Sequence, residues 1–212
     1  VPRLDTISIE RLSEGAVLFL YNQPKIANAF TLRQWVDMRV ALEWARDEPE
    51  IKVIVQYVLT RSKAWYTIYA DMFLPRGGKG KHYSAGTLIG YPKILVAAVH
   101  GASIGWGCTQ LFNFDLVYAH PSAFFQTPFV SLGIVPEGAS SYSFPKVMGR
   151  QHANRLLVEG DRIPAQDMYV SGLVTKVIES GSVEEFHKAV CAKAKKIAEN
   201  SAESLRLTKK LV

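Results

Sequence analysis

Two runs of apolar, largely β-branched residues constrain the fold of this chain more than any other feature of its sequence. Ile51–Leu59 and Ile94–Val99 lack the strict alternation of polar and apolar residues that marks a strand with one face in water. They match instead the pattern of strands that are buried on both faces. A sheet built from such strands needs helices on both of its sides, so the chain is predicted to be a layered α/β protein.

Further elements alternate along the chain as such layers require. Ile7–Glu10 and Ala16–Leu20 flank a turn and predict a β-hairpin. Thr31 and Gln34 form a capping box at the start of a helix that reaches Pro49. The apolar face of this helix is predicted from residues that recur every four positions, namely Leu32, Val36, Val40 and Trp44.

The remaining predicted elements complete one domain. Strands are expected at Leu116–Ala119 and Leu173–Ile178, and helices are expected after Trp106, Ser140, Arg150, Pro164 and Val183. The 212 residues fit a single domain, 1–212, without an internal boundary. Residues 61–93 are the exception, because they show no helical period. So long a segment is either a functional loop or a region whose elements are misassigned.

The composition fits a globular domain and argues against a nucleic-acid-binding, metal-binding or membrane-spanning protein. Apolar residues make up 48% of the chain and charged residues 21%, which is ordinary for a globular domain. The 25 Lys and Arg exceed the 19 Asp and Glu by six, which suits an anionic ligand, but they are scattered, so no nucleic acid partner is expected. Cys108 and Cys191 show no metal-ligand spacing, and no apolar run approaches the ~20 residues of a membrane span. We therefore expect neither a metal site nor a membrane span.

The glycines after the second buried strand allow more than one interpretation. Gly101–Gly105 has the form Gly-x-Ser-x-Gly, so Ser103 could be the nucleophile of a hydrolase. Such an enzyme also needs a histidine in a turn after a late strand, and His120, His152 and His187 are not in that context. Alternatively, the glycines let the chain turn into a helix whose first N–H groups are free to stabilise an oxyanion. Close packing of the strand against the helix would explain them equally well.

Glu137 is the candidate base. It lies between Pro136 and Gly138, and mainly apolar residues precede it. A carboxylate in an apolar loop is desolvated, so its pKa rises and it becomes a better base near neutral pH. The alternative is a structural role at the N-terminus of the following helix, where the helix dipole favours a negative charge.

Together these segments resemble the crotonase superfamily, which contains the enoyl-CoA hydratases and isomerases. The resemblance is carried by Val96–Gly107, by Phe124–Gly138, and by Leu157–Ala165 with Gly172–Val174. Asn22–Phe30 is similar to the family's loop along the coenzyme A nucleotide. The resemblance implies a crotonase-like spiral of ββα units, (ββα)n, with helices covering the sheets and with the family's C-terminal helices truncated.

The resemblance also implies roles for individual residues. Hydratases of the family use two glutamates, but the corresponding positions here hold Phe129 and Thr109. Glu137, in Pro-Glu-Gly-x-Ser-Ser, matches instead the lone glutamate of the Δ3,Δ2-enoyl-CoA isomerases, particularly the peroxisomal type. The backbone N–H groups of Ala85 and Trp106 are implied to form the oxyanion hole. The residues implied to bind the acyl-CoA substrate are Lys25, Ala27, Ala29, Ser84, Gly86, Phe129 and Leu132.

One segment departs from the family's arrangement. Gly78–Gly86 matches the first oxyanion segment, which in the family closely follows the first buried strand. In this chain extra residues precede it, and only Thr87–Lys93 separate it from the next strand. Tyr66–Asp71 is a poorer match for the same role.

The resemblance therefore predicts an enoyl-CoA isomerase that moves the double bond of 3-enoyl-CoA to the trans-2 position in fatty acid β-oxidation. It implies no cofactor beyond the coenzyme A of the substrate, a homo-oligomer (trimer or hexamer), and a peroxisomal or alternatively mitochondrial location. Two other outcomes stay open. One is a catalytically silent crotonase-fold module that binds acyl-CoA or a protein. The other is an enoyl-CoA hydratase, with Asp71 or Glu159 as the second carboxylate.

Overall fold

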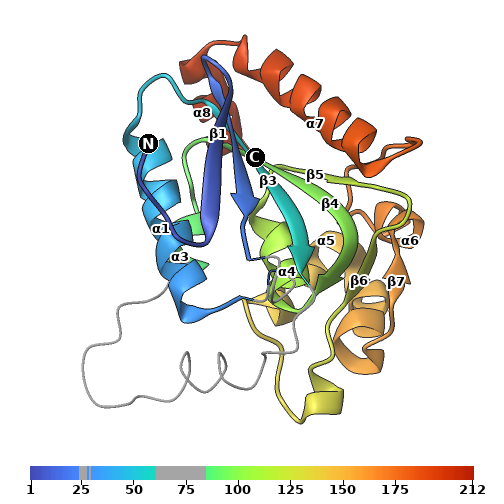
Figure 1. Ribbon diagram of the computed structural model, residues 1–212. Helices are drawn as coiled ribbons and strands as arrows, with labels where there is room; N and C mark the ends of the chain where they lie inside the picture. Colours follow the sequence, from blue (N-terminus) through green and yellow to red (C-terminus); the bar gives the residue numbers. More distant parts are fainter. Residues whose placement is uncertain (24–27, 29, 61–84) are drawn as a thin grey trace, which may run out of the picture.

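The two predicted buried runs form the centre of the sheet in the computed structural model, which describes residues 1–23, 28, 30–60 and 85–212 (Figure 1). β3 (Val53–Thr60) and β4 (Ile94–Ile104) lie side by side and parallel. Ile54 belongs to a hydrophobic core on one face of the sheet and Val55 to a second core on the other face. The prediction of strands buried on both faces is therefore confirmed.

Further strands extend this centre into a mixed sheet. The predicted hairpin is confirmed as β1 (Ile7–Ser13), which pairs antiparallel with β2 (Ala16–Tyr21). β2 lies parallel to β3, and β5 (Leu116–Ala119) lies parallel to the first part of β4. The order across the sheet is β1-β2-β3-β4-β5-β8. Because β2 to β5 run in one direction, the segments that follow them emerge at the same edge of the sheet.

A smaller branch at the end of β4 was not predicted. The last residues of β4 pair with β6 (Phe124–Gln126), which pairs antiparallel with β7 (Ile163–Pro164). These strands are too short to show a period in the sequence. The strand predicted at Leu173–Ile178 shrinks to β8 (Lys176–Val177) beside β5. It begins late because the Val174 N–H bonds the Met168 carbonyl at the end of the preceding helix.

Helices cover both faces of the sheet (Figure 1). α1 (Leu32–Asp47) packs on one face and α7 (Val183–Ala198) on the other. The helix expected from Val183 onward is present as α7, and its Phe186, Val190 and Ala194 are fully buried. The other described helical segments are α3 (Ala85–Leu88), α4 (Trp106–Thr109), η2 (Gln110–Asn113), η3 (Val130–Leu132), α5 (Ser140–Asn154), η4 (Arg155–Glu159), α6 (Ala165–Val170) and α8 (Ala202–Leu211).

Most helix positions match the predictions. The helices expected after Trp106, Ser140 and Pro164 are present as α4, α5 and α6, and α4 is only one turn long. The separate helix expected after Arg150 continues α5 beyond a kink at Gly149, where φ is 73°. None of the helices in the described part of the chain is long and apolar enough to cross a membrane.

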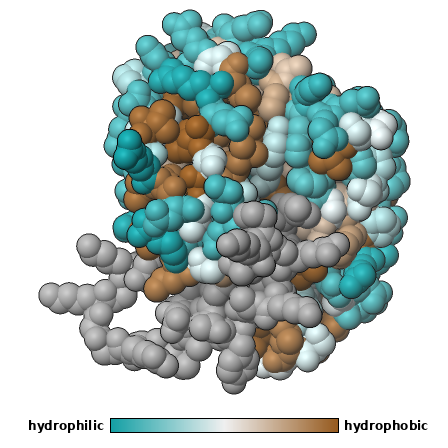
Figure 2. Space-filling view, in the orientation of Figure 1, coloured by the Kyte–Doolittle hydropathy of each residue, from teal (hydrophilic) through white to brown (hydrophobic). Residues whose placement is uncertain are grey.

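α1 buries a different face from the one predicted. The Thr31 hydroxyl accepts from the Gln34 N–H at 3.2 Å, so the predicted N-cap is confirmed. Leu32, however, is 52% exposed, and the other residues of the predicted face are half-buried. Hydrophobic residues accordingly reach the surface in the region of α1 and β1 (Figure 2). The apolar residues that α1 buries are Trp35, Met38, Ala41, Leu42 and Ala45.

Long-range contacts select the face that α1 buries. Asp37 is buried, and its Oδ2 accepts from the Thr6 N–H and hydroxyl at 2.9 and 2.8 Å. The Trp35 ring lies 4.5 Å from the Trp106 ring, centroid to centroid. Both partners are distant in sequence, so a local period of four could not reveal them.

Candidate active site

The end of β4 presents a free backbone N–H. Gly105 adopts φ 59° and ψ −119°, which glycine tolerates and other residues do not, and the chain turns there from β4 into α4. The Gly105 carbonyl accepts from the N–H groups of Cys108 and Thr109, both at 2.8 Å, which holds α4 on the turn. The N–H of Trp106, the first residue of α4, has no acceptor within the described ranges. This is the N–H group predicted for the oxyanion hole.

Ser103 is not placed to act as a nucleophile. Its side chain is fully buried, and its hydroxyl donates to the Gly107 carbonyl at 2.9 Å. The three candidate histidines bond elsewhere: His120 with Ser122, His152 with the Met148 carbonyl, and His187 with His100. The described residues thus contain no Ser103–histidine pair, and the hydrolase interpretation is rejected.

Glu137 is a buried carboxylate with a weakly satisfied charge. Its side chain is 6% exposed, and its Oε1 accepts from the Thr109 hydroxyl at 3.1 Å. Burial raises the pKa of Glu137 from 4.5 to about 7, and the Thr109 hydrogen bond acts in the opposite direction. The predicted rise of the pKa is therefore confirmed. A carboxyl group with such a pKa can both accept and return a proton at neutral pH.

The backbone after Glu137 is left-handed at two successive residues. Gly138 has φ 61° and Ala139 has φ 58°, and α5 begins only at Ser140. The left-handed conformation costs roughly 1–2 kcal/mol at a residue with a Cβ, as Ala139 is. The N–H and hydroxyl of Ser140 both donate to the Glu137 carbonyl, at 3.0 and 2.6 Å. Because Glu137 lies before α5 and not in its first turn, the geometry does not support the alternative role at a helix dipole.

The segment Glu137–Ala139, called the Glu137 loop below, lies directly against α4. A Cβ added at Gly138 would come within 3.0 Å of Thr109 Oγ1 and 3.2 Å of the Trp106 ring. Glycine is therefore required at this position both for its positive φ and for the close approach. This contact brings the carboxylate and the free N–H region together, although 28 residues separate Thr109 from Glu137 in the sequence.

Aromatic side chains give the site an apolar wall. The ring centroids of Phe30 lie 5.3 Å from Trp35 and 6.4 Å from Trp106, and Phe129 is fully buried. Trp106 and Phe129 were predicted from the sequence as site residues, whereas Phe30 and Trp35 were not. The only local sign of their role was that both are aromatic and lie near the start of α1. This sign does not indicate that they contact Trp106, which is distant in the sequence.

Other predicted site residues are only partly accounted for. Ala85 and Gly86 are the first two residues of α3. Leu132 lies in η3 and is 48% exposed. Glu159, a proposed second carboxylate, is exposed in η4. Lys25, Ala27, Ala29, Asp71 and Ser84 lie outside the described residues, as does the segment Tyr66–Asp71.

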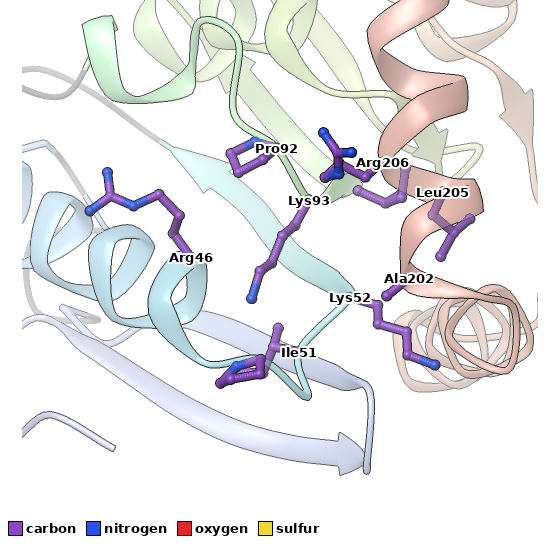
Figure 3. A pocket seen from close by; sticks show the side chains of 10 residues that line it. Arg46, Ile51, Lys52, Pro92, Lys93, Ala202, Leu205 and Arg206 are labelled. Carbon is purple, nitrogen blue, oxygen red and sulfur yellow. The ribbon is translucent and has the colours of Figure 1, made fainter.

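A groove of about 260 Å³ lies at the opposite end of the sheet, where β3 and β4 begin (Figure 3). Its lining includes four basic side chains, Arg46, Lys52, Lys93 and Arg206. Figure 3 shows Lys93 extending toward α1 and Lys52 toward the junction of α7 and α8. The groove therefore does not touch Glu137 or α4.

The cations of this groove have partners within the protein. Lys93 Nζ donates to the carbonyls of Ala45 and Glu48 at the end of α1. Lys52 Nζ donates to the carbonyls of Ala198 and Asn200 at the end of α7, at 2.9 and 3.0 Å. The two arginines pair with neighbouring carboxylates, Arg46 with Asp47 and Arg206 with Glu203. The lysines thus act as C-terminal helix caps.

Comparisons with known proteins identify the family of this chain. The model of the enoyl-CoA hydratase/isomerase family matches residues 77–212. The human protein named Enoyl-CoA delta isomerase 2 is 33% identical over 94% of this chain, which spans about half (52%) of that relative. The mouse protein named Enoyl-CoA delta isomerase 3, peroxisomal, is 29% identical over 94% of this chain and 64% of its own length.

A solved structure shows the same fold. It is a putative enoyl-CoA hydratase/carnithine racemase from Magnetospirillum magneticum AMB-1, with a TM-score of 0.86 and 26% identity. The match covers 99% of this chain and 82% of that one. The predicted crotonase-like α/β fold, a mixed sheet covered by helices, is therefore confirmed. The chain belongs to the enoyl-CoA hydratase/isomerase family.

Proposed function

We propose that this chain is an enoyl-CoA isomerase that converts 3-enoyl-CoA to trans-2-enoyl-CoA, a step in the β-oxidation of unsaturated fatty acids. The observation that carries the proposal is Glu137, a carboxylate buried beside α4 with a pKa of about 7. Such a group fits a reaction in which one base removes a proton and gives it back. The names of the human and mouse relatives support the same reaction.

The proposed mechanism needs one carboxylate and a place for negative charge. Glu137 takes the proton from C2, so the C2–H bond breaks and an O–H bond forms on the carboxylate. The electron pair spreads over the thioester oxygen and C4 as a dienolate. The O–H bond then breaks, a C4–H bond forms, and the double bond lies between C2 and C3.

Backbone N–H groups would stabilise the dienolate. Trp106 offers such a group at the start of α4, and Ala85, at the start of α3, would supply the second. Each donor of this kind is typically worth roughly 3 kcal/mol of barrier. Proton transfer next to a thioester requires only a base and these donors, so no cofactor beyond the substrate's coenzyme A is proposed.

The substrate would bind along residues from several loops. We assign Lys25, Ala27 and Ala29 to the coenzyme A nucleotide, and Ser84 and Gly86 to the region of the thioester. Phe129 and Leu132 would contact the acyl chain. Leu132 is half exposed and leaves apolar surface that a bound acyl chain would cover, whereas Phe129 is fully buried and its assignment rests on the family resemblance alone.

The isomerase is distinguished from a hydratase by the number of carboxylates. Thr109 and Phe129 occupy the positions where a hydratase would hold glutamates, and neither can activate water. We therefore expect purified protein to convert 3-hexenoyl-CoA to the conjugated 2-enoyl-CoA. Crotonyl-CoA should give negligible 3-hydroxybutyryl-CoA. Glu137→Gln should lower kcat on 3-hexenoyl-CoA by about 10³-fold, because the amide cannot act as the base.

Three results would contradict the proposal. Comparable rates on the two substrates would indicate a hydratase with a second carboxylate. Activity of Glu137→Gln within about tenfold of the parent, ~1.4 kcal/mol, would mean that another residue is the base. Binding of acyl-CoA without turnover would identify a catalytically silent module.

Location and assembly are part of the same proposal. We propose a peroxisomal location, in line with the name of the mouse relative. We also propose a homo-oligomer, a trimer or hexamer. A fluorescent fusion of the complete protein that stained mitochondria would overturn the first point, and a monomeric mass by light scattering would overturn the second.

A further inference from the structure

We propose that Thr109 is a positioning residue for the reaction assigned above. Its hydroxyl holds one carboxylate oxygen of Glu137, so that the other oxygen alone carries the proton between C2 and C4. This inference rests on the proposed function and extends it to a residue that does not itself touch the reacting atoms.

Thr109 is fixed by its own surroundings. It is fully buried at the end of α4, and its N–H bonds the Gly105 carbonyl at 2.8 Å. The glycine turn and the hydrogen bonds of α4 therefore fix the position of its backbone. Gly138 lies against its side chain, since an added Cβ would come within 3.0 Å of Oγ1 and 3.3 Å of the Thr109 Cβ. The hydroxyl is thus held between a short rigid helix and the Glu137 loop.

The hydroxyl meets one oxygen of the carboxylate. Thr109 Oγ1 donates to Glu137 Oε1 at 3.1 Å, and the described part of the chain offers that carboxylate no second hydrogen-bond donor. A carboxylate held at one oxygen cannot exchange its two oxygens by rotation without breaking this bond. Among the described residues Oε2 receives no hydrogen bond, so we assign the proton transfer to this oxygen.

The bond also sets the proton affinity of the base. A hydrogen bond to an ionised oxygen favours the ionised form, so Thr109 counteracts the effect of burial. Without the hydroxyl, burial would act unopposed and the pKa of Glu137 would rise further. Thr109 thus keeps the carboxylate ionised enough to start the reaction.

Substitutions at position 109 separate this role from packing. Thr109→Val keeps the shape of the side chain and removes the donor, whereas Thr109→Ser keeps the donor. In Thr109→Val we expect the acid limb of the kcat/KM profile for 3-hexenoyl-CoA to move upward by about one pH unit. Activity on that limb should fall about tenfold, and Thr109→Ser should restore both the limb and the rate.

A matched control removes the same kind of bond elsewhere. The buried Thr6 hydroxyl donates to Asp37 of α1 at 2.8 Å, and both residues are distant in sequence from Thr109 and Glu137. Thr6→Val should reduce stability and leave the acid limb in place. A limb unchanged in Thr109→Val, or moved equally in Thr109→Ser, would overturn the proposal.

A direct titration separates this proposal from the assigned function. The infrared carboxyl band that disappears in Glu137→Gln reports the protonation of Glu137 without any turnover. If the parent protein is inactive but Thr109→Val raises the midpoint of this band, the assigned function fails and the hydrogen-bonding role of Thr109 stands. If the parent is active and the midpoint does not move, the positioning role is wrong and the function stands.

Discussion

Charged side chains at the two ends of the parallel strands differ in how many hydrogen bonds they make within the protein. Where β3 and β4 begin, Lys52 and Lys93 each donate to two helix-end carbonyls. Where β4 ends, Glu137 is more deeply buried yet receives one side-chain hydrogen bond, from Thr109. The basic side chains of the groove thus have their partners within the protein, whereas Glu137 is the side chain to which we assign the proposed reaction. The candidate active site is therefore marked by a buried carboxylate with few hydrogen-bond partners, and not by a large number of charged residues.

The largest effect is expected at Gly138, the glycine that lets Glu137 approach α4. Gly138→Ala should lower the free energy of unfolding by about 4 kcal/mol, because it combines a left-handed backbone with a contact of 3.0 Å. The proposed isomerase activity should be lost with it, since Glu137 can no longer pack against Thr109. Urea denaturation and the 3-hexenoyl-CoA assay measure the two effects.

Gly90 provides the matched control. It has φ +68° and nothing lies within 4 Å of a Cβ placed there. Gly90→Ala should therefore show the backbone cost alone, roughly 1–2 kcal/mol, with activity retained. Equal losses in the two variants would show that the contact with α4 adds nothing.

A second test measures how much the buried carboxylate of Glu137 lowers the free energy of unfolding. The pKa of Glu137 is about 7 in the folded protein, above its unfolded value of 4.5. The folded state therefore binds the proton more tightly, and stability falls as the pH rises through this window. Glu137→Gln should remove this loss, gaining about 2–3 kcal/mol over the parent between pH 5 and pH 8.

Denaturation curves at the two pH values check this gain. The exposed Glu159→Gln is the control, and it should show no such gain at pH 8. If the difference in free energy of unfolding between Glu137→Gln and the parent did not grow with pH, Glu137 would not be titrating as an isolated acid.

At the opposite end of the sheet, a lysine should matter for stability alone. Lys93→Met keeps the aliphatic stem but leaves the Ala45 and Glu48 carbonyls without their cap. We expect a loss of about 1–2 kcal/mol in denaturation experiments, with kcat/KM unchanged. Arg206→Met, in the same groove, removes an exposed ion pair and should change neither quantity. A loss of activity in Lys93→Met would break the distinction between the two ends.

The smallest expected effect lies inside the site itself. Ser103→Ala removes the hydrogen bond to the Gly107 carbonyl and should cost about 1 kcal/mol of stability. Activity should stay within about twofold of the parent, ~0.4 kcal/mol. Labelling of Ser103 by a serine-directed reagent, together with loss of turnover, would return the hydrolase interpretation.

Features written locally in the sequence were predicted well. β3 and β4 are β-branched runs, and α7 carries a clear helical period, so each has a pattern that shows its burial. Glu137 was found because its neighbours are apolar and a proline and a glycine flank it. Its raised pKa then follows from burial, which local composition indicates.

Features that depend on distant contacts were not predicted. The face of α1 was wrong because apolar residues lie on more than one side of that helix, and Trp35 is buried by a contact with Trp106. Thr109 was identified as the residue that replaces a carboxylate, but no local signal showed that it bonds Glu137. The roles assigned to Lys25 and Ser84 stay predictions, because both lie outside the described residues.

The separation of the two hydrophobic cores by one sheet has a consequence for how the protein opens. Trp106 and Phe129 belong to the core under α1, whereas Phe186 and Val190 of α7 belong to the core on the other face. α7 packs on β1 to β4, whereas it shares few contacts with α4, and regions of a domain that share few contacts with each other can open separately. Amide protons of α7 should then exchange with solvent through a partial opening that leaves α4 protected. An opening confined to the face under α7 would therefore leave the carboxylate of Glu137 and its neighbours assembled.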